Sequence, residues 1–327
     1  MKRGVLVAIV LIITMLLGCS TKAPVSLPPT QETTPIIDAH AHIAGGSPEE
    51  MASYIDELVV EMDKLGVVKA TLEGLRTKRT PKDDQDILVA YDRHPNRFYP
   101  YLSGFNPQDE GAIDYVRKQL ETGKWRGLGE IYLRHSPGGV LNPADHPVML
   151  EIYDLCAEYE VPIHIHFESD YGIDYELGIK EIKRALAHNP NTIFIWAHGC
   201  HGNIHLMDEF PNLYTTVEIY SGGELFNKAW TDRLMIGSDV GLPGVIICGG
   251  GSYAEKMGEL RQLLSSFDQA TMENVAYKNI AKLMKDESVL HTMRLTFLCL
   301  RSLPLGKFGR APHPSYMTYD AGAEPLF

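Results

Sequence analysis

From residue 35 onward, short apolar runs typical of β-strands alternate with longer segments whose apolar residues recur at helical spacing. The first such pair is the run 35–40, followed by a segment in which Met51, Ile55 and Leu58 fall on one helical face. This alternation is typical of parallel strands joined by crossover helices, because each helix returns the chain to the same end of the sheet. The sequence therefore predicts an α/β fold built on a parallel sheet.

The number of strands narrows the prediction further. We predict strands at residues 35–40, 67–75, 97–103, 127–133, 161–167, 192–198, 213–220 and 233–239. Helices are predicted from Ser47 to Gly66, near 82–93, 108–122, 144–159, 175–188, 203–210 and 223–230, and at 252–267 and 269–285. An open doubly wound sheet is the alternative, but it usually carries a glycine-rich turn after its first strand, where this chain has His-Ala-His. Eight strands with interposed helices predict a (β/α)8 TIM barrel over residues 35–285, with its functional site at the carboxyl ends of the strands.

The amino-terminal segment differs from the rest of the chain. Lys2 and Arg3 precede an apolar stretch at 5–17 that is shorter than a membrane-spanning helix, and Leu-Leu-Gly-Cys follows at 16–19. This pattern resembles a bacterial lipobox, in which Cys19 would be lipidated. A plain secretory signal or a transmembrane anchor are the alternatives. We predict a lipoprotein signal peptide at 1–18, a Pro-rich tether at 19–34 and an extracytoplasmic, lipid-anchored location on a bacterial membrane.

Three further segments carry smaller predictions. The glycine-rich stretch 241–252 directly follows the eighth predicted strand, which would place it over the mouth of a barrel. The tail 286–327 loses the strand–helix pattern and is assigned no role. The later cysteines form no Cys-x-x-Cys pair, and Cys156 lies in an apolar helical stripe, so we expect it to be a buried free thiol.

The charge balance restricts the partners of the chain. There are 42 acidic and 30 basic residues, giving a formal net charge of −12. A nucleic-acid-binding surface is typically basic, because phosphate contacts dominate the affinity. The composition thus argues against nucleic acid as a partner and is compatible with a small-molecule substrate.

Histidine and acidic residues gather at the carboxyl ends of the predicted strands, which all face one mouth in a barrel. They are His40, His42, Glu130, His164, His166, His198 and Asp239. Residues two apart in a strand point to the same side, so His40 and His42 can hold one ion together. Burying so many polar groups would be costly without a partner such as a metal. We therefore predict a metal centre at this mouth.

The motifs at these positions resemble the amidohydrolase superfamily, especially the amidohydrolase-2 type and the TatD-like hydrolases. The matching segments are Ile-Asp-Ala-His-Ala-His at 37–42, Gly-Leu-Gly-Glu-Ile at 127–131, Pro-Ile-His-Ile-His at 162–166, Trp-Ala-His-Gly at 196–199, Gly-Ser-Asp at 237–239 and Tyr-Lys-Asn-Ile-Ala-Lys-Leu at 277–283. The resemblance spans residues 35–285 and is diffuse between the motifs.

The resemblance implies one or two divalent ions, zinc first, with manganese or iron as alternatives. His40, His42 and Asp239 would bind the more buried ion. His166 and His198 would bind a second ion or orient the substrate. Glu130 would bridge, in the position that a carboxylated lysine fills in other branches.

The same resemblance implies a mechanism. Asp239 would accept a proton from the attacking water and later deliver it to the leaving group. The metal, or His198, would polarise the oxygen under attack. The reaction predicted is hydrolysis of a C–N, C–O or P–O bond of a small molecule.

Other polar residues near the strand ends have less specific interpretations. His164 is expected to be a core histidine rather than a ligand, and His201 and His205 to be exposed to solvent. Glu168 and Asp170 are consistent with either substrate contacts or a polar loop. Residues whose signals remain weak are Glu73, Glu218 and the loop cations Arg76, Lys78 and Arg79.

Two alternatives to a hydrolase are retained. Amidohydrolase-2 proteins include decarboxylases, which need one metal and typically lack the glutamate of the fourth strand, so Glu130 argues against that activity. A surface lipoprotein that binds a ligand without catalysis is the other alternative, and the complete set of histidines and aspartate argues against it.

Overall fold

A computed structural model describes residues 34–43, 47–74, 80–136, 138–218, 230–242, 245–246 and 251–290. The predicted signal peptide, Cys19 and nearly all of the tether lie outside these residues. So do Arg76, Lys78 and Arg79, most of the helix predicted at 223–230, parts of the stretch 241–252 and the tail from residue 291. Among the described helices, none combines the length and apolar character needed to cross a membrane.

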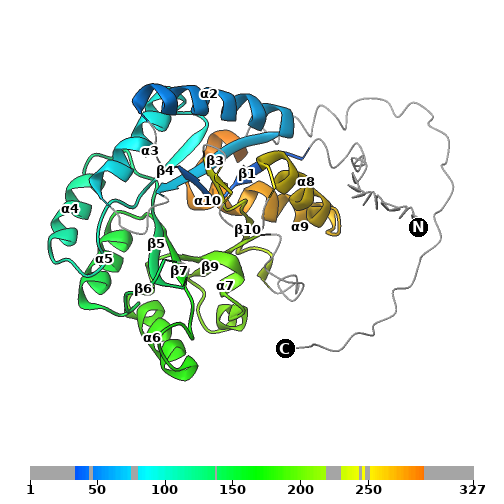
Figure 1. The fold of residues 1–327 in the computed structure, drawn as a ribbon. Coiled ribbons are helices and arrows are strands. Elements are labelled where there is room, and N and C mark those ends of the chain that lie inside the picture. Colours follow the sequence, from blue (N-terminus) through cyan, green and yellow to red (C-terminus); the bar gives the residue numbers. More distant parts are fainter. Residues whose placement is uncertain are drawn as a thin grey trace, which may run out of the picture.

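The strands form a ring of parallel pairs (Figure 1). In chain order the strands are β1 (Ile36–Asp38), β2 (Ala41–Ile43), β3 (Val67–Gly74), β4 (Phe98–Leu102), β5 (Gly127–His135), β7 (Ile163–Phe167), β8 (Phe194–Trp196), β9 (Leu213–Val217), β10 (Leu234–Ile236) and β11 (Val240–Leu242). Hydrogen-bonded neighbours run β10-β9-β8-β7-β5-β4-β3-β2-β11, and β1 pairs with β3.

The ring closes because β10 and β11 are separated only by residues 237–239 and together form the eighth strand, while β1 and β2 form the first. The backbone amide of Ala39 also donates to Ile236 O at 2.9 Å. The predicted (β/α)8 barrel is therefore confirmed. Two short antiparallel strands extend it: β6 (Val140–Leu141) pairs with β5, and β12 (Val245–Ile246) pairs with β11.

Helices cover the outside of the ring (Figure 1). They are α2 (Pro48–Leu65), α3 (Pro81–Arg93), α4 (Gly111–Leu120), α5 (Pro147–Glu158), α6 (Tyr175–His188) and α8 (Tyr253–Leu264). The helix predicted at 203–210 is the 3-10 helix η1 (Ile204–Asp208), which follows the short turn α7 (Ala197–Cys200). The helix predicted at 269–285 consists of α9 (Gln269–Glu273), the π-helical η4 (Asn274–Lys278) and α10 (Asn279–Leu283).

The ends of α2 show why the sequence patterns predicted its bounds. The Ser47 side chain accepts from the Glu50 amide, and the Glu50 carboxylate accepts from the Ser47 amide, so two otherwise unsatisfied donors are paired. Gly66 ends the helix with a φ of 66°, a left-handed conformation that glycine adopts without steric cost. β3 then begins at Val67, the next residue.

Asp38 fastens the first strand to the eighth. Its buried carboxylate accepts from Ser238 N at 2.9 Å, from Ser238 Oγ at 2.7 Å and from the Tyr253 hydroxyl of α8 at 3.1 Å. Burial raises the pKa of Asp38 to about 6, against the lowering effect of the hydrogen bonds from Ser238. This cluster holds the strand ends that carry His40 and Asp239 in one register.

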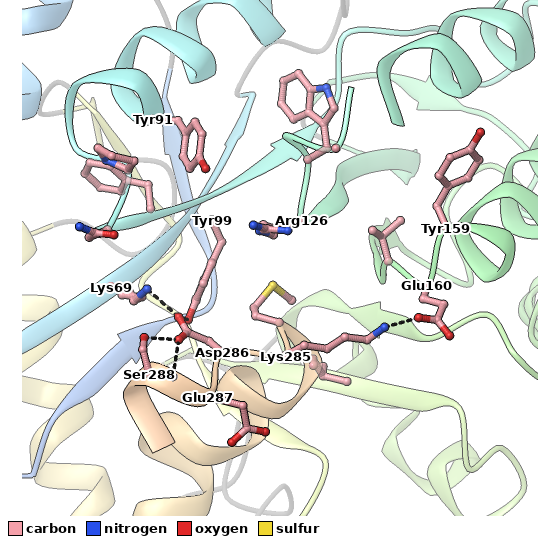
Figure 2. Close-up of a pocket in the computed structure, with 18 of the residues that line it drawn as sticks. Lys69, Tyr91, Tyr99, Arg126, Tyr159, Glu160, Lys285, Asp286, Glu287 and Ser288 are labelled. Atoms are coloured by element: carbon pink, nitrogen blue, oxygen red, sulfur yellow. Dashed lines mark hydrogen bonds and ion pairs between the residues drawn. The ribbon is translucent and has the colours of Figure 1, made fainter. Parts of the chain in front are cut away.

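The opposite end of the barrel contains a cavity of about 560 Å³ (Figure 2). It is lined by residues at the amino-terminal ends of β3 and β4 and by the chain that follows α10. There Asp286 accepts from Lys69 Nζ at 2.6 Å and from the Tyr99 hydroxyl at 2.7 Å, and Lys285 pairs with Glu160. These contacts fasten the end of α10 across the strand starts, at the end away from the histidines.

The packing of α6 against the loop after β7 provides a stability test. A Cβ atom at Gly178 would lie 1.8 Å from the backbone oxygen of Ser169, whereas one at Gly258 in α8 would meet nothing within 4 Å. We expect Gly178→Ala to lower the free energy of unfolding by about 1–3 kcal/mol, because the helix must move off the loop. The matched change Gly258→Ala should raise it by about 0.5–1 kcal/mol through helix propensity. Urea unfolding of both variants checks this, and equal shifts would contradict the packing described.

Candidate metal centre

Four acceptor atoms converge at the carboxyl ends of the strands. His40 Nε2 and His42 Nε2 lie 3.0 Å apart, and Glu130 Oε2 is 3.5 Å from each of them. Asp239 Oδ1 lies 3.7 Å from His40 Nε2 and 3.3 Å from His42 Nε2. All four residues are buried, with exposures of 0% for the two histidines and 2% for the two acids. The structure thus brings four of the predicted ligands together.

The outer nitrogens of the two histidines determine their tautomers. His40 Nδ1 lies 2.8 Å from Glu218 Oε1, and His42 Nδ1 lies 3.2 Å from the carbonyl oxygen of Gly74. Because these oxygens only accept, both Nδ1 atoms carry the hydrogen. With both hydrogens on Nδ1, the two Nε2 atoms face each other and the two carboxylates, as two ligand atoms of one cation would. Burial alone would lower the pKa of His40, but the carboxylates of Glu130 and Asp239 raise it well above its usual value, so this group of atoms attracts a cation.

The spacing of these atoms suits a metal ion. A tetrahedral zinc ion with ligand distances of about 2.1 Å has ligand atoms roughly 3.4 Å apart. The five distances given above lie between 3.0 and 3.7 Å. The residues present therefore fit a divalent transition metal held by two imidazoles and two carboxylates.

Glu130 also faces a second group of histidines. Its Oε1 atom lies 3.0 Å from His166 Nδ1 and 3.7 Å from His198 Nε2, while its Oε2 atom faces His40 and His42. Nitrogens of His166, His198 and His201 lie within 4.8 Å of one another. The two oxygens of one carboxylate thus point to two sets of potential ligands, as expected for a bridging residue.

The pKa values respond to this arrangement. Burial alone would raise the pKa of Glu130 and of Asp239, but His40 and the other neighbouring histidines lower both below the usual range of a carboxyl group. Burial would also lower the pKa of His166, yet the carboxylates of Glu130 and Glu168 raise it to about 9. The site therefore holds its acids as anions and attracts positive charge.

Glu218 positions histidines of both sets. It lies immediately after β9, and its Oε1 and Oε2 atoms are 2.8 Å from His40 Nδ1 and 3.3 Å from His198 Nδ1. A carboxylate on the outer nitrogen fixes the tautomer and orientation of a metal-binding histidine. The sequence signal for Glu218 was its place at the end of the seventh strand. Gly237 leaves room for this contact, since a Cβ atom there would lie 2.5 Å from His40 Cβ.

His164 lies in the barrel interior, as predicted for a core histidine. Its Nδ1 atom is 2.8 Å from Glu73 Oε1, and its ring meets that of His40 edge-on with 4.5 Å between centroids. Both members of this pair are 0% exposed. Glu73, a weak candidate in the sequence, is thus the partner of His164.

Of the polar residues that follow β7 and β8, some lie at the site and others are exposed to solvent. Glu168 accepts from the Ser136 amide at 2.9 Å and lies 3.1 Å from His166 Nε2, whereas Asp170 and His205 are exposed. The expectation for His205 is confirmed. The expectation for His201 was wrong, because its Nε2 atom is buried and its ring lies 4.6 Å from that of His166. A left-handed turn after β8 directs it inward.

Among the described residues, the two cysteines belong to none of the candidate metal-binding clusters. Cys156 and Cys200 are both buried and free, which confirms the prediction for Cys156. Burial raises the pKa of the Cys156 thiol and of the Cys200 thiol, to about 12 for the latter. Neither thiol is therefore ionised near neutral pH.

A family model described as amidohydrolase matches residues 37–284. The chain belongs to the amidohydrolase family. The match supports the amidohydrolase-2 type and does not bear on the TatD-like motifs. Among curated proteins, none matches the sequence.

Solved structures share the fold of this family member. A TIM-barrel protein of Bordetella bronchiseptica is 16% identical, with a TM-score of 0.57, over 76% of this chain and 98% of its own. The 4-oxalomesaconate hydratase of Rhodopseudomonas palustris is 14% identical, with a TM-score of 0.59, over 80% and 99%. The 5-carboxyvanillate decarboxylase of Novosphingobium aromaticivorans, solved with manganese, is 12% identical, with a TM-score of 0.55, over 80% and 100%. At these identities the likeness shows the fold.

Replacing the positioning carboxylate tests the metal centre. We expect Glu218→Gln to weaken divalent-metal binding by about 10–100-fold, because the amide no longer supplies a negative acceptor to both His40 and His198. Competition with a chromophoric chelator measures the affinity. Glu151→Gln, an exposed change on α5, is the control and should bind like the parent protein. Equal metal affinity of the two variants would contradict the positioning role of Glu218.

Proposed function

We propose that this amidohydrolase-family protein is a metal-dependent hydrolase that cleaves a C–N, C–O or P–O bond of a small molecule. The observation that supports the proposal is the position of Glu130, whose two oxygens face two sets of potential ligands. By resemblance to the family, the decarboxylases of the amidohydrolase-2 type typically lack a glutamate at this strand. The same two-sided arrangement leaves decarboxylation as the second candidate rather than the first.

The residues present define the roles in such a reaction. A bound divalent ion, zinc in the first instance, would lower the pKa of water so that hydroxide is available near neutral pH. His40, His42, Glu130 and Asp239 would hold it, and His166 and His198 would hold a second ion or orient the substrate. Asp239, an anion 3.3 Å from His42 Nε2, would accept the proton of the attacking water and return it to the leaving group. His198 would polarise the oxygen under attack.

A cavity of about 360 Å³ supports a small substrate. It lies between the loop after β4, the middle of β5 and the β6 hairpin, and its lining side chains are all uncharged. One of them, Tyr132, also meets the ring of His166, with 5.7 Å between centroids. A volume in this range is typical of sites for small molecules. The acidic net charge of the chain, −12, argues in the same direction against nucleic acid.

Asp239→Asn tests the proton-transfer role. We expect this change to lower kcat by about 10²–10⁴-fold on the best substrate of an ester, amide, lactone and phosphoester panel, because the amide cannot accept the proton. Bound metal, measured by elemental analysis, should largely remain. The exposed change Asp114→Asn on α4 is the control and should leave both quantities unchanged.

The same panel separates the candidate functions. Hydrolysis that survives Asp239→Asn at the parent rate would contradict the role given to this carboxylate. Release of carbon dioxide from aromatic acids without hydrolysis would replace the hydrolase by a decarboxylase. Bound metal without turnover of any kind would favour a binding protein.

We also propose that Cys19 carries a lipid that anchors the protein on the outer side of a bacterial membrane. The support is the sequence Leu-Leu-Gly-Cys after an apolar stretch with two preceding cations. Cys19→Ser should abolish incorporation of labelled fatty acid and release the protein from the membrane fraction. A Cys156→Ser change controls for the loss of a thiol, and labelling that persists in the Cys19 variant would contradict the anchor.

A further inference from the structure

We propose that His201 is the third imidazole of a second metal site, which it forms with His166 and His198 beside the His40–His42–Asp239 set. The inference rests on the proposed function only in taking this mouth to be a metal centre. The chemical class of its ligand is a borderline divalent transition metal such as zinc or cobalt, which neutral imidazole binds well. With His201, the second ion would have three imidazole ligands of its own and would share only Glu130 with the first ion.

The backbone after β8 places His201 where a ligand is needed. His198 has φ 58° and ψ 43°, Gly199 has 62° and 37°, and His201 has 46° and 46°, with Cys200 also at a positive φ of 57°. The amide of His201 donates to His198 O at 3.1 Å. These residues form a single left-handed turn, so residues three apart lie on the same side. The rings of His198 and His201 are accordingly 5.1 Å apart.

This turn is unfavourable for most of its residues. Only glycine adopts the left-handed conformation routinely, because in other L-residues the Cβ atom approaches the next carbonyl oxygen. Asn203 holds the turn by donating to the carbonyl oxygens of Cys200 and His201, each at 3.2 Å, and to Ser169 Oγ at 3.0 Å. Strained backbone kept in place by surrounding contacts is concentrated at functional sites. What this turn accomplishes is to direct two imidazoles toward His166.

The Nε2 atom of His201 has the properties of a metal-ligand position. Its Nε2 atom is buried and has no hydrogen-bond partner in the described part of the chain. The three rings lie close together, at 4.6 Å for His166–His201 and 4.9 Å for His166–His198. A buried polar atom without a partner is costly, and a cation among the three nitrogens removes that cost. Glu130 Oε1, 3.0 Å from His166 Nδ1, would supply negative charge to the same ion.

The orientation of His166 is fixed from outside the set. Glu168 Oε1 lies 3.1 Å from His166 Nε2 and also accepts from the Ser136 amide at 2.9 Å. An acceptor on one ring nitrogen orients the other nitrogen for metal binding. The second set therefore repeats the design of the first, in which Glu218 and Gly74 O fix the two imidazoles.

The test counts ions per chain and their affinities. The full-length protein, His201→Asn and His205→Asn are stripped with a chelator, titrated with Co²⁺ and followed by visible absorption and elemental analysis. Asparagine tolerates the left-handed backbone, so this change removes the imidazole and keeps the turn. We expect two ions for the parent and for the exposed His205 variant. His201→Asn should bind the first ion unchanged and lose the second, or bind it at least 10-fold more weakly.

Two further measurements keep the outcome interpretable. His201→Gly also removes the imidazole and suits a positive φ, and circular dichroism of both variants shows whether the fold is intact. With Mn²⁺, the parent should give the electron paramagnetic resonance signal of a coupled pair and His201→Asn that of isolated ions. Retention of two ions at parental affinity in both variants, or one ion in the parent itself, would overturn the proposal. Neither result would decide the proposed hydrolase function, which the Asp239→Asn experiment tests separately.

Discussion

The convergence of lone pairs inside the barrel is the constraint on which the rest of this structure depends. His40 Nε2 and His42 Nε2 lie 3.0 Å apart, and each lies 3.3–3.7 Å from Glu130 Oε2 and Asp239 Oδ1, in a buried region. Acceptors this close repel one another, and burial removes the water that would separate them. A bound metal ion would stabilise the set, and its binding would stabilise the folded state that assembles its ligands.

Much of the surrounding structure serves to hold that set in place. Asp38 joins the first strand to the eighth through Ser238, which places His40 and Asp239 on adjacent strand ends. Glu218 then fixes the tautomer of His40 from the seventh strand. Both carboxylates are buried, with exposures of 0% for Asp38 and 2% for Glu218. Their role is to position side chains, and the barrel supplies the rigid strands from which they can do so.

Local chemistry explains how far the sequence alone could predict the fold. The helix predicted at 175–188 is α6 with the same bounds, and the caps at Ser47 and Gly66 define α2 as expected. Such signals act over a few residues, so they can be read without knowledge of the tertiary structure. The π-helical turn η4 and the 3-10 helix η1 escaped prediction, because tertiary packing rather than periodicity decides between helix types.

The same distinction between local and tertiary determinants applies to the candidate ligands. His40 and His42 were predictable because residues two apart on a strand share a side. His201 was not, since its direction depends on a left-handed turn that the sequence His-Gly-Cys-His-Gly permits but does not require. Glu218 was visible only as an acid at a strand end. Glu218 and His40 are 178 positions apart in the chain. A single sequence does not indicate which residues so far apart come into contact.

The two sets of ligands differ in their exposure to solvent, so the centre has an inner and an outer side. His40 and His42 are 0% exposed, whereas His166 is 7% and His198 is 9% exposed. The second set therefore lies nearer the mouth, with Glu130 between it and the interior. A substrate entering from the mouth meets His166, His198 and His201 first, and Asp239 only at the depth of the first set. An ion at the outer set would bind and leave more readily than the inner one, so its affinity would depend on the outer ligands. A third imidazole matters more at that position than it would in the closed interior.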